Sequence, residues 1–343
     1  MTGAAADPFA SRLPVTLITG FLGSGKTTLL ARLLRHPGMN RAAVVINEFG
    51  ETGIDHELVA SSSENTTLLS NGCLCCTVRT DLQETLRELF IRRRAGEVID
   101  FDRVFIEASG LADPVPVLHT LQTDGLLGAQ YRLDGVVTLV DAVNGMGQLD
   151  TMPEAVKQAA VADRIILSKT DLADGAAVAL LEERLKGFNS FASCLKAIQG
   201  EVDPEALVNL GPANARVLPS QWLGTGGGEQ YLGKRLAGAH DASIRSFCLW
   251  FDKPFSWQVL NAALQALTAL RGPDLLRVKG LVNVEGEVGP VVLQGAQHIF
   301  HPPVTLEGWR SEDRRSRIVF IVRNIARDSV EALFAAASAL ARA

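Results

Sequence analysis

Three of the five cysteines stand within four residues, at Cys73, Cys75 and Cys76. Three thiolates supply most of a tetrahedral zinc shell, and soft sulfur ligands favour Zn²⁺, Cu⁺ or an iron–sulfur cluster over Mg²⁺ or Ca²⁺. The remaining ligand has to come from a carboxylate, from water or from a bound nucleotide. Two plainer interpretations stay open, namely a redox pair formed by Cys73 and Cys76, and ordinary buried thiols.

The local backbone decides whether these thiols can share one ion. Neighbouring side chains on an extended strand point to opposite faces, so a regular strand would separate Cys75 from Cys76. Asn71-Gly72, directly before the cluster, is typical of a turn. We therefore expect a loop that turns its sulfur atoms inward, followed by a helix from about Thr77 to Arg94.

A phosphate-binding pattern precedes the cysteines. The segment from Gly20 to Thr27 reads GFLGSGKT and matches G-x-x-x-x-G-K-[ST]. It follows an apolar run and opens a helical pattern, which is the context that this motif requires. Backbone N–H groups of such a turn surround phosphate oxygens, Lys26 neutralises them, and the Thr27 hydroxyl binds Mg²⁺. We expect a nucleoside triphosphate to bind here together with Mg²⁺.

Carboxylates follow two of the apolar runs. Glu107 ends one run and precedes a small turn, as a Walker B glutamate would, and such a group holds Mg²⁺ through water or orients the attacking water. Glu48 and Glu51 follow another run, where a switch segment would approach the γ-phosphate. They could order water, help to hold Mg²⁺ or complete the thiolate site. Solvated carboxylates without a function are the plainer alternative for all three.

A base-recognition loop is indicated by Ser168-Lys169-Thr170-Asp171, which comes directly after an apolar run. An aspartate there can accept both the N1–H and the N2–H of guanine, and adenine offers no such pair of donors. Asn usually occupies the first position of this motif, so Ser168 is a departure. We expect GTP as the substrate, with ATP as the fallback.

Apolar runs alternate with helical patterns up to about Leu210, which predicts βαβ units around a mostly parallel sheet. The expected strands are Pro14–Thr19, Ala42–Ile46, Arg103–Glu107, Gly135–Val140 and Arg164–Ser168. The expected helices lie near Lys26–Arg35, Asp81–Arg94, Pro114–Gln122, Glu154–Ala162 and Gly175–Leu185. We therefore predict an α/β P-loop NTPase domain over residues 1–210.

A second domain is predicted after an interruption rich in glycine and proline. Residues 211–240 read as a linker. Beyond it, the expected strands are Ile244–Phe251, Leu275–Glu285, Pro290–Leu293 and Arg317–Val322, and the expected helices are Ser256–Leu270 and Asp328–Ala341. This order predicts a smaller α+β domain over residues 241–343, a split βαβ unit of the ferredoxin-like kind.

Charge and apolar patterning exclude several partner classes. The 343 residues carry 33 Lys and Arg against 38 Asp and Glu, so no global attraction to nucleic acid or anionic membrane is expected. The N-terminus lacks a signal-peptide pattern, and no apolar run approaches the roughly 20 residues of a membrane span. We expect a cytoplasmic protein, in which clustered cysteines serve metal or redox chemistry rather than a disulfide framework.

Taken together, these motifs resemble the CobW-type metallochaperone GTPases in their order and spacing. The resemblance is carried by the phosphate loop, Asn47–Glu51, Gly72–Cys76, Glu107–Pro114 and Ser168–Asp171. It covers nearly the whole chain, because Ile244–Asn324 looks like the C-terminal domain of that family.

The resemblance implies GTP hydrolysis coupled to delivery of a transition metal to a client apo-metalloenzyme, most commonly Zn²⁺ and in some members cobalt or iron. It implies that Thr27 and Glu107 serve Mg²⁺ and that the three clustered cysteines bind the delivered metal. Binding of GTP and GDP would fall to Gly23, Ser24, Gly25, Lys26, Thr27, Thr28, Lys169 and Asp171. A homodimer is a further expectation.

Our hypothesis is that GTP closes the site around a metal and that hydrolysis reopens it near a client. The catalytic candidates are Lys26, Glu107 and Glu48, and Glu51 is the candidate that completes the cysteine site. The sequence shows no obvious water-positioning Gln or arginine finger, so we expect slow intrinsic hydrolysis. Two other classes stay open: a metal sensor that signals without transfer, and a P-loop phosphotransferase regulated by a Cys73–Cys76 disulfide.

Overall fold

The computed structural model describes residues 12–47, 66–68, 74–78, 82–210, 244–300, 303–309 and 312–340. The chain divides into two compact units. The first unit comprises Met1–Arg184 with Ala192–Ala213, and the second comprises Leu185–Phe191 with Asn214–Ala343.

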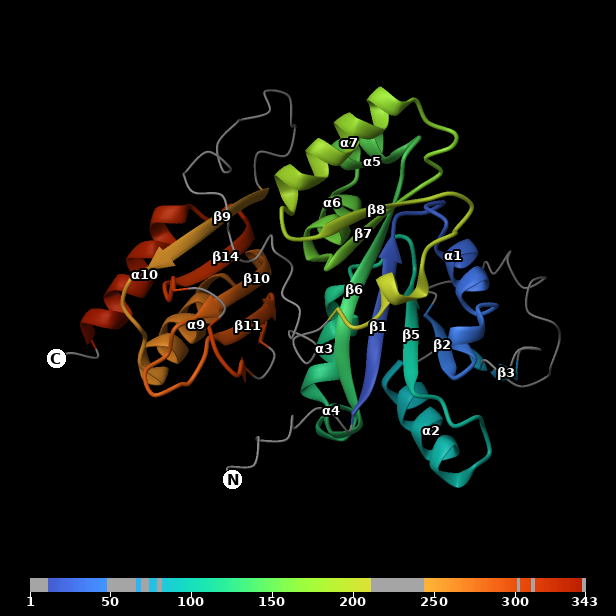
Figure 1. The fold of residues 1–343 in the computed structure, drawn as a ribbon, viewed down its shortest axis with the longest axis horizontal. Helices are drawn as coiled ribbons and strands as arrows, with labels where there is room; N and C mark the ends of the chain where they lie inside the picture. Colours follow the sequence, from blue (N-terminus) through green and yellow to red (C-terminus); the bar gives the residue numbers. More distant parts are fainter. Residues whose placement is uncertain are drawn as a thin grey trace. The chain divides into compact units, whose positions relative to one another are not determined.

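An eight-stranded sheet in the order β3-β4-β2-β5-β1-β6-β7-β8 forms the centre of the first unit (Figure 1). Every neighbouring pair is parallel except β3 with β4, which is antiparallel. The strands are β1 (Leu13–Gly20), β2 (Ala42–Asn47), β3 (Thr66–Leu68), β4 (Leu74–Val78), β5 (Arg103–Ala108), β6 (Tyr131–Asp141), β7 (Arg164–Ser168) and β8 (Ser193–Ala197).

Helices connect these strands, because parallel neighbours need a crossover. They are α1 (Lys26–Leu33), α2 (Leu82–Ala95), α3 (Val115–Thr123), α4 (Gly125–Gln130), α5 (Gly145–Thr151), α6 (Pro153–Val161) and α7 (Gly175–Phe188). Apolar residues of α1 such as Leu29 pack with Ile18 and Val137 on one face of the sheet. Thr138 follows Val137 and so faces the other side, where its hydroxyl donates to the carbonyl of Gln158 on α6 at 2.7 Å.

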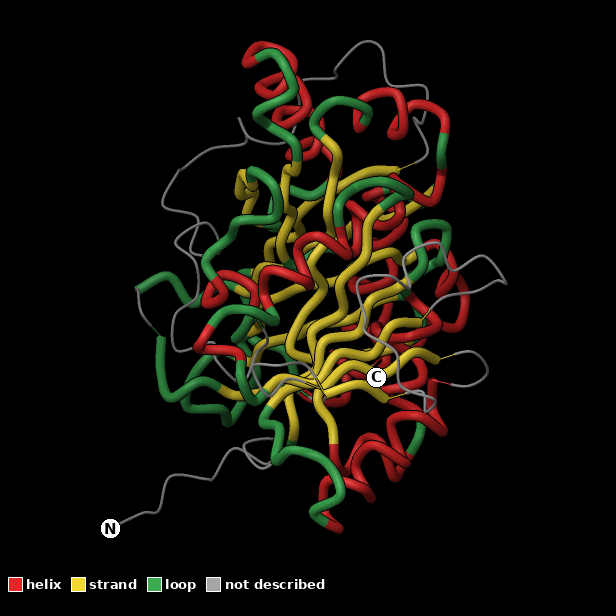
Figure 2. Tube along the Cα trace, turned by 90° about the vertical axis from the view of Figure 1, so that its right-hand side faces the viewer, coloured by secondary structure: helices red, strands yellow, loops and turns green. Residues whose placement is uncertain are grey.

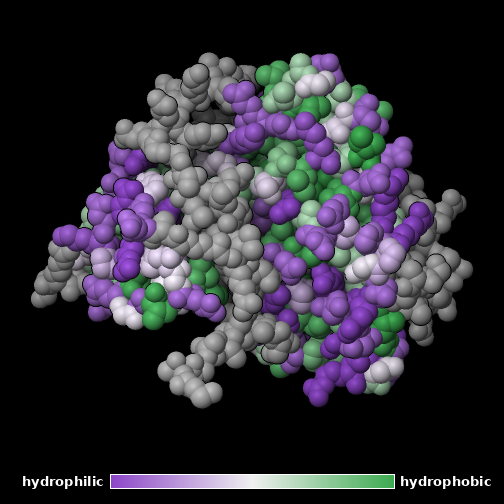
Figure 3. Space-filling model, viewed as in Figure 1, coloured by the Kyte–Doolittle hydropathy of each residue, from purple (hydrophilic) through white to green (hydrophobic). Residues whose placement is uncertain are grey.

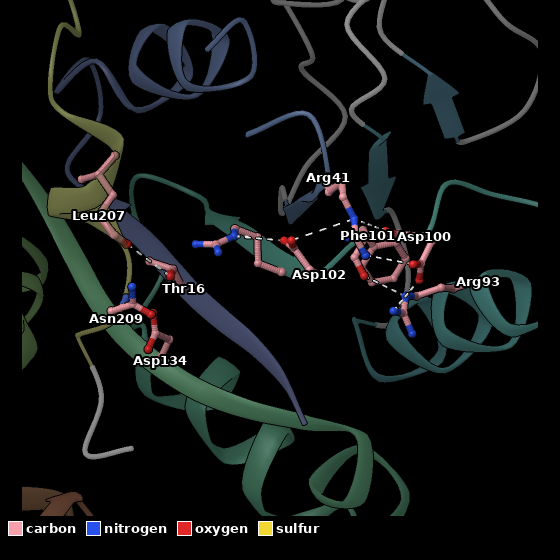
Figure 4. Close-up of polar contacts among 10 residues, drawn as sticks. Thr16, Arg41, Arg93, Asp100, Phe101, Asp102, Asp134, Leu207 and Asn209 are labelled. Carbon is pink, nitrogen blue, oxygen red and sulfur yellow. Dashed lines mark hydrogen bonds and ion pairs between the residues drawn. The ribbon is translucent and has the colours of Figure 1, made fainter. Parts of the chain in front are cut away.

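Polar contacts hold the loops at the amino ends of the strands of this sheet (Figure 4). The Arg41 guanidinium lies 2.9 Å from a carboxylate oxygen of Asp100, which also pairs with Arg93 on α2. The end of the unit is tied down as well, since the N–H of Asn209 donates to a carboxylate oxygen of Asp134 at 2.6 Å. The phosphate-binding motif lies at the other end of the strands, because it follows the carboxyl end of β1.

Most of the predicted elements of this unit are confirmed within a few residues, and one expectation is wrong. Cys75 and Cys76 do not lie in a loop but on strand β4, paired in parallel with Val44 and Val45 of β2. Helix α2 accordingly begins at Leu82 rather than at Thr77. The short edge strand β8 was not anticipated, because its sequence SCLKA has no clear alternation.

The second unit has a six-stranded antiparallel sheet in the order β12-β11-β10-β14-β9, with β13 paired to β11. Its elements are β9 (Ile244–Phe251), α9 (Trp257–Arg271), β10 (Leu275–Val282), β11 (Val291–Ala296), β12 (Ile299–Phe300), β13 (Val304–Thr305), β14 (Ser316–Arg323) and α10 (Arg327–Leu340). The expected split βαβ is present, because β14 lies between β9 and β10 and is antiparallel to both. Helix α10 follows the last strand that the structure describes.

Aromatic side chains fill the core of the second unit. The ring centroids of Phe251 and Phe255 are 4.9 Å apart, and Phe334 on α10 packs against both. The Ser256 hydroxyl caps α9 by accepting from the N–H of Val259. In Figure 2 the strands of each unit are drawn in yellow and the helices in red. Among the helices of the described residues, none has the length and apolar character needed to cross a bilayer.

Polar and apolar side chains intermix over the face drawn in Figure 3. Several large apolar side chains are exposed near the carboxyl ends of the first sheet, including Leu22, Leu111 and Leu172. Scattered exposure of this kind is normal for a protein surface.

Candidate functional site

The phosphate-binding loop lies between the end of β1 at Gly20 and the start of α1 at Lys26. Gly23 and Gly25 have φ values of 73° and 93°, a left-handed conformation that only glycine adopts at little cost. Because α1 starts directly after this turn, the N–H groups of its first residues are left without helical carbonyl partners. The loop thus has the backbone geometry that binds phosphate at a helix N-terminus.

Lys26 folds back over this loop. Its ammonium donates to the carbonyl of Gly20 at 2.9 Å and to that of Phe21 at 3.3 Å, and the residue is only 8% exposed. The hydroxyl of Ser24 is fully buried beside it and has no hydrogen-bond partner among the residues that the structure describes. A buried cation and an unpaired buried hydroxyl fit an anion that accepts hydrogen bonds.

Thr27 joins this loop to the end of β5. Its hydroxyl donates to a carboxylate oxygen of Glu107 at 3.1 Å, and Glu107 is 5% exposed. The contact follows from the sheet order, since β5 neighbours β1 and Glu107 pairs in register with Ile18. A hydroxyl and a carboxylate in contact are the hard oxygen ligands that Mg²⁺ prefers, so the predicted pair fits that ion.

The predicted base loop is fixed to the phosphate loop. The Ser168 hydroxyl donates to the carbonyl of Ser24 at 2.6 Å, a buried contact between β7 and the phosphate loop. Lys169 takes a left-handed φ of 58°, and the carboxylate of Asp171 is exposed to solvent. Ser168 therefore supplies a structural link, although it departs from the usual Asn of this motif.

Asp141 is a residue of this site that the sequence argument missed. It ends β6, is 1% exposed and accepts from the ammonium of Lys169 at 2.7 Å. It also accepts from the backbone N–H of Val143 and from the backbone and side chain of Asn144. Burial alone would raise the pKa of Asp141, but these donors outweigh burial and lower it. An acidic residue at the end of an apolar strand was the available signal, as it was for Glu107.

The cysteine-bearing strand lies two strands away from Glu107 in the same sheet. Strand β2 separates them, with Val45 paired to Cys76 on one side and to Ile106 on the other. Cys73, Glu48 and Glu51 lie outside the described residues. Within the part of the chain that is described, no three His, Cys, Asp or Glu side chains are arranged to hold a metal ion.

The remaining predicted phosphate residue is Thr28, which is exposed on the first turn of α1. The structure thus brings Lys26, Thr27, Glu107 and Ser168 together around one loop. Lys169 belongs to the same region through Asp141, whose strand β6 neighbours β1. This arrangement suits a bound nucleotide, and it lies at the carboxyl ends of parallel strands, the usual place for ligands in such sheets.

Comparison with known proteins agrees with this geometry. The family model of the CobW/HypB/UreG nucleotide-binding domain matches residues 14–196, and that of the cobalamin synthesis protein CobW C-terminal domain matches residues 244–338. The zinc chaperone YjiA of Escherichia coli is 33% identical over 94% of this chain and 98% of its own length. The crystal structure of the Zn(II)-bound YjiA GTPase matches with a TM-score of 0.76 at 32% identity, over 95% of this chain and 98% of that chain.

Two further relatives extend the comparison. The zinc chaperone CobW of Pseudomonas aeruginosa is 32% identical over 91% of this chain and 88% of its own length. The zinc-regulated GTPase metalloprotein activator 1 of Saccharomyces cerevisiae is 28% identical over 94% of this chain and 82% of its own length. These matches and the phosphate loop confirm the expected fold and enzyme class, and the chain belongs to the CobW/HypB/UreG family of P-loop GTPases.

Proposed function

We propose that this GTPase is a metallochaperone that binds Zn²⁺ at Cys73, Cys75 and Cys76 and releases it to a client apo-metalloenzyme when GTP is hydrolysed. The observation that carries the proposal is the sheet order, in which β2 alone separates the cysteine strand β4 from the Glu107 strand β5. The names of the relatives, zinc chaperones and a metalloprotein activator, support zinc as the cargo.

Each group at the nucleotide site has a role that its chemistry suits. Gly23, Ser24, Gly25, Lys26, Thr27 and Thr28 bind the phosphates. Mg²⁺, held by the Thr27 hydroxyl and the Glu107 carboxylate, supplies charge neutralisation at the phosphate oxygens. Asp171 accepts the two guanine N–H groups, and Lys169 supports the base from its position against Asp141.

The coupling runs through β2. This strand ends at Asn47, and in the sequence Glu48 and Glu51 follow the strand that holds β4 to β5. In this proposal Glu48 orients water at the γ-phosphate and Glu51 supplies a metal ligand. Consecutive residues of a regular strand face opposite sides, so using both Cys75 and Cys76 requires a local distortion of β4.

Guanine recognition is tested by changing the base. Xanthine carries an oxygen where guanine carries the N2 amino group, so a carboxamide at residue 171 should pair with xanthine better than a carboxylate does. Asp171→Asn should lose GTP hydrolysis by roughly 100-fold or more and gain activity on XTP. Asp174→Asn is the matched control, because the Asp174 carboxylate accepts from the N–H of Ala176 at the start of α7, a bond that an amide oxygen can also accept. Unchanged GTP use by Asp171→Asn would remove this residue from the site.

Metal coupling is tested by competition titration of Zn²⁺ in the apo, GDP and GTP-analogue states. Coupling is reciprocal, so the factor by which the analogue tightens Zn²⁺ must equal the factor by which Zn²⁺ tightens the analogue. Equal zinc affinity in the three states would reject the proposal. Cys75→Ser with Cys76→Ser should abolish the high-affinity site, and Cys194→Ser serves as the control because Cys194 lies on β8.

Release of Zn²⁺ during GTP hydrolysis distinguishes a metallochaperone from a metal sensor. Protein loaded with radioactive Zn²⁺ and GTP should release the metal to a chelator at the rate of hydrolysis, whereas a sensor would retain it. The homodimer, the cytoplasmic location and the existence of a client apo-metalloenzyme remain predictions from the sequence.

A further inference from the structure

The loop that follows Glu107 is held from one side by helix α6. The side-chain amide nitrogen of Gln158 lies 3.1 Å from the carbonyl oxygen of Gly110 and 3.2 Å from that of Ala112. Gln158 is 1% exposed. A buried side chain of one helix thus binds two alternate carbonyls of the loop between β5 and α3.

The chemistry of these contacts fixes how the amide is turned. Carbonyl oxygens only accept, so the two N–H groups of the amide have to face them. The amide oxygen is then buried without a hydrogen-bond partner among the described residues. Burying an acceptor without a partner costs free energy, which an apolar side chain at this position would avoid. The two hydrogen bonds that the amide nitrogen donates are therefore the feature that a glutamine provides here.

Holding these carbonyls also fixes the neighbouring N–H groups. A peptide group is planar and trans, so its N–H points opposite to its C=O. With the Gly110 and Ala112 carbonyls directed at α6, the N–H groups of Leu111 and Asp113 point away from α6. Gln158 therefore sets the orientation of two peptide planes in the loop.

The preceding residue on the helix, Lys157, makes a second contact with the loop. The ammonium of Lys157 lies 2.7 Å from a carboxylate oxygen of Asp113, whose other oxygen accepts from the N–H of Val115 at the start of α3. Adjacent residues of α6 thus hold Gly110, Ala112 and Asp113. The loop cannot change its path without breaking contacts to this helix.

The other side of the loop touches the nucleotide site. A Cβ placed on Gly110 would lie 2.8 Å from the backbone nitrogen of Leu22 and 2.9 Å from its Cα, so the two backbones are in direct contact. Leu22 lies within the phosphate-binding loop. Glu107, three residues before Gly110, contacts Thr27. The chain of contacts therefore runs from α6 through Gly110 to the phosphate-binding loop.

We infer that Gln158 is a positioning residue for GTP hydrolysis, acting through the Gly110 and Ala112 peptides to hold the loop after Glu107 against the phosphate-binding loop. Its side-chain amide acts on the carbonyls of the loop. The inference rests on the proposed phosphate site at Lys26 and Thr27. Its effect should fall on the chemical step, because the phosphate-binding loop itself keeps its own glycines and Lys26.

The test is Gln158→Leu, which keeps the bulk of the side chain and removes both donors. We expect kcat for GTP to fall by roughly 10- to 100-fold, as for a misplaced catalytic loop. The KM for GTP and the Kd for GDP should stay within about threefold of the wild-type values, since ground-state binding is retained.

Two other variants keep the result interpretable. Thr138→Val removes a buried hydrogen bond to the backbone of Gln158 and leaves the loop contacts intact, so it should lower the melting temperature but keep kcat. Lys157→Met loses only the partly exposed anchor to Asp113 and should lower kcat by a few-fold without affecting the core. It replaces Gln158→Leu if that variant does not fold.

Three outcomes would overturn the inference. Unchanged kcat in Gln158→Leu, or in Lys157→Met if Gln158→Leu does not fold, would leave Gln158 a purely structural residue. A parallel loss of GDP affinity would mean that the whole pocket collapses. A loss of kcat equal to that of Thr138→Val would assign the effect to helix packing. Failure of the proposed nucleotide site is recognised separately, because Lys26→Ala would then bind GTP and GDP normally.

Discussion

The ammonium of Lys169 lies 2.7 Å from a carboxylate oxygen of Asp141, a residue that is 1% exposed. The pair connects the end of β6 with the base-recognition loop after β7. Lys169 holds a left-handed φ of 58°, which is unfavourable for a residue with a Cβ. Asp141 therefore offsets a local backbone cost at the site where guanine is proposed to bind.

Neutralising Asp141 should weaken nucleotide binding. Asp141→Asn keeps the shape of the side chain but loses the charge-assisted bond to Lys169, so we expect GDP affinity to fall by roughly tenfold, or about 1.4 kcal/mol. A fluorescent GDP titration measures the change. Asp150→Asn is the control, because it breaks a different ion pair of a carboxylate, the one with Arg184 that joins α5 to α7. Equal losses in the two variants would argue against a specific role of Asp141.

Acid should remove the contribution of Asp141 to folding stability. Its pKa is lowered in the folded state from the ordinary value of 3.8, because donors from Lys169, Val143 and Asn144 outweigh the effect of burial. A lowered carboxyl pKa stabilises the fold above the ordinary pKa, and the contribution is lost as the pH falls through the folded value. The unfolding free energy of wild type minus that of Asp141→Asn should therefore shrink below pH 3.8. A difference that grows on acidification would contradict the assignment.

Adding one methyl group at Gly110 should disturb the nucleotide site. Gly110→Ala places a Cβ 2.8 Å from the backbone nitrogen of Leu22, and neither backbone can move far. We expect weaker GTP binding and a loss of about 1–3 kcal/mol of stability from overpacking. Gly147→Ala is the matched control, since among the described residues no atom beyond its own helical turn lies within 4 Å of the added Cβ, and alanine favours the helix. Denaturant unfolding and nucleotide titration of both variants test the contrast.

Cysteine labelling should separate the metal thiols from the structural ones. Burial raises the pKa of Cys248 to about 11, with Arg317 and Arg327 offsetting only part of the effect. At pH 7.5 this thiol is almost entirely protonated and should label slowly, with or without metal. Zn²⁺ with a GTP analogue should protect Cys73, Cys75 and Cys76. Protection of Cys194 or Cys248 instead would place the metal elsewhere.

The grouping of Lys26, Thr27 and Glu107 around one loop could be predicted because each belongs to a short motif that is local in sequence. The phosphate loop requires glycines and a lysine at fixed spacing, and Glu107 and Lys169 directly follow or end apolar strands. Gln158 could not be found in this way. A buried glutamine on a helix has the same place in the apolar pattern as an exposed one, and only the tertiary contact with Gly110 distinguishes it.

The cysteine strand was missed for a different reason. The sequence argument treats Cys75 and Cys76 as metal ligands in a loop, which obscures the apolar character that Leu-Cys-Cys-Thr-Val shares with a short strand. Its partner β3 has only three residues and gives no periodic signal. The pairing with β2 depends on long-range contacts that single-sequence patterns do not encode.

Strand β4 lies near the edge of the sheet, so amide hydrogen exchange can test whether the proposed release of zinc requires this strand to detach. On one side β4 pairs with five residues of β2, and on the other only the three-residue β3 covers it. If metal release required this strand to detach, the backbone amides of Cys75 and Cys76 would exchange with deuterium faster in the GDP state than in the GTP state. If only side chains moved, those amides would stay protected while zinc left, so exchange at two residues reports whether the sheet itself opens during turnover.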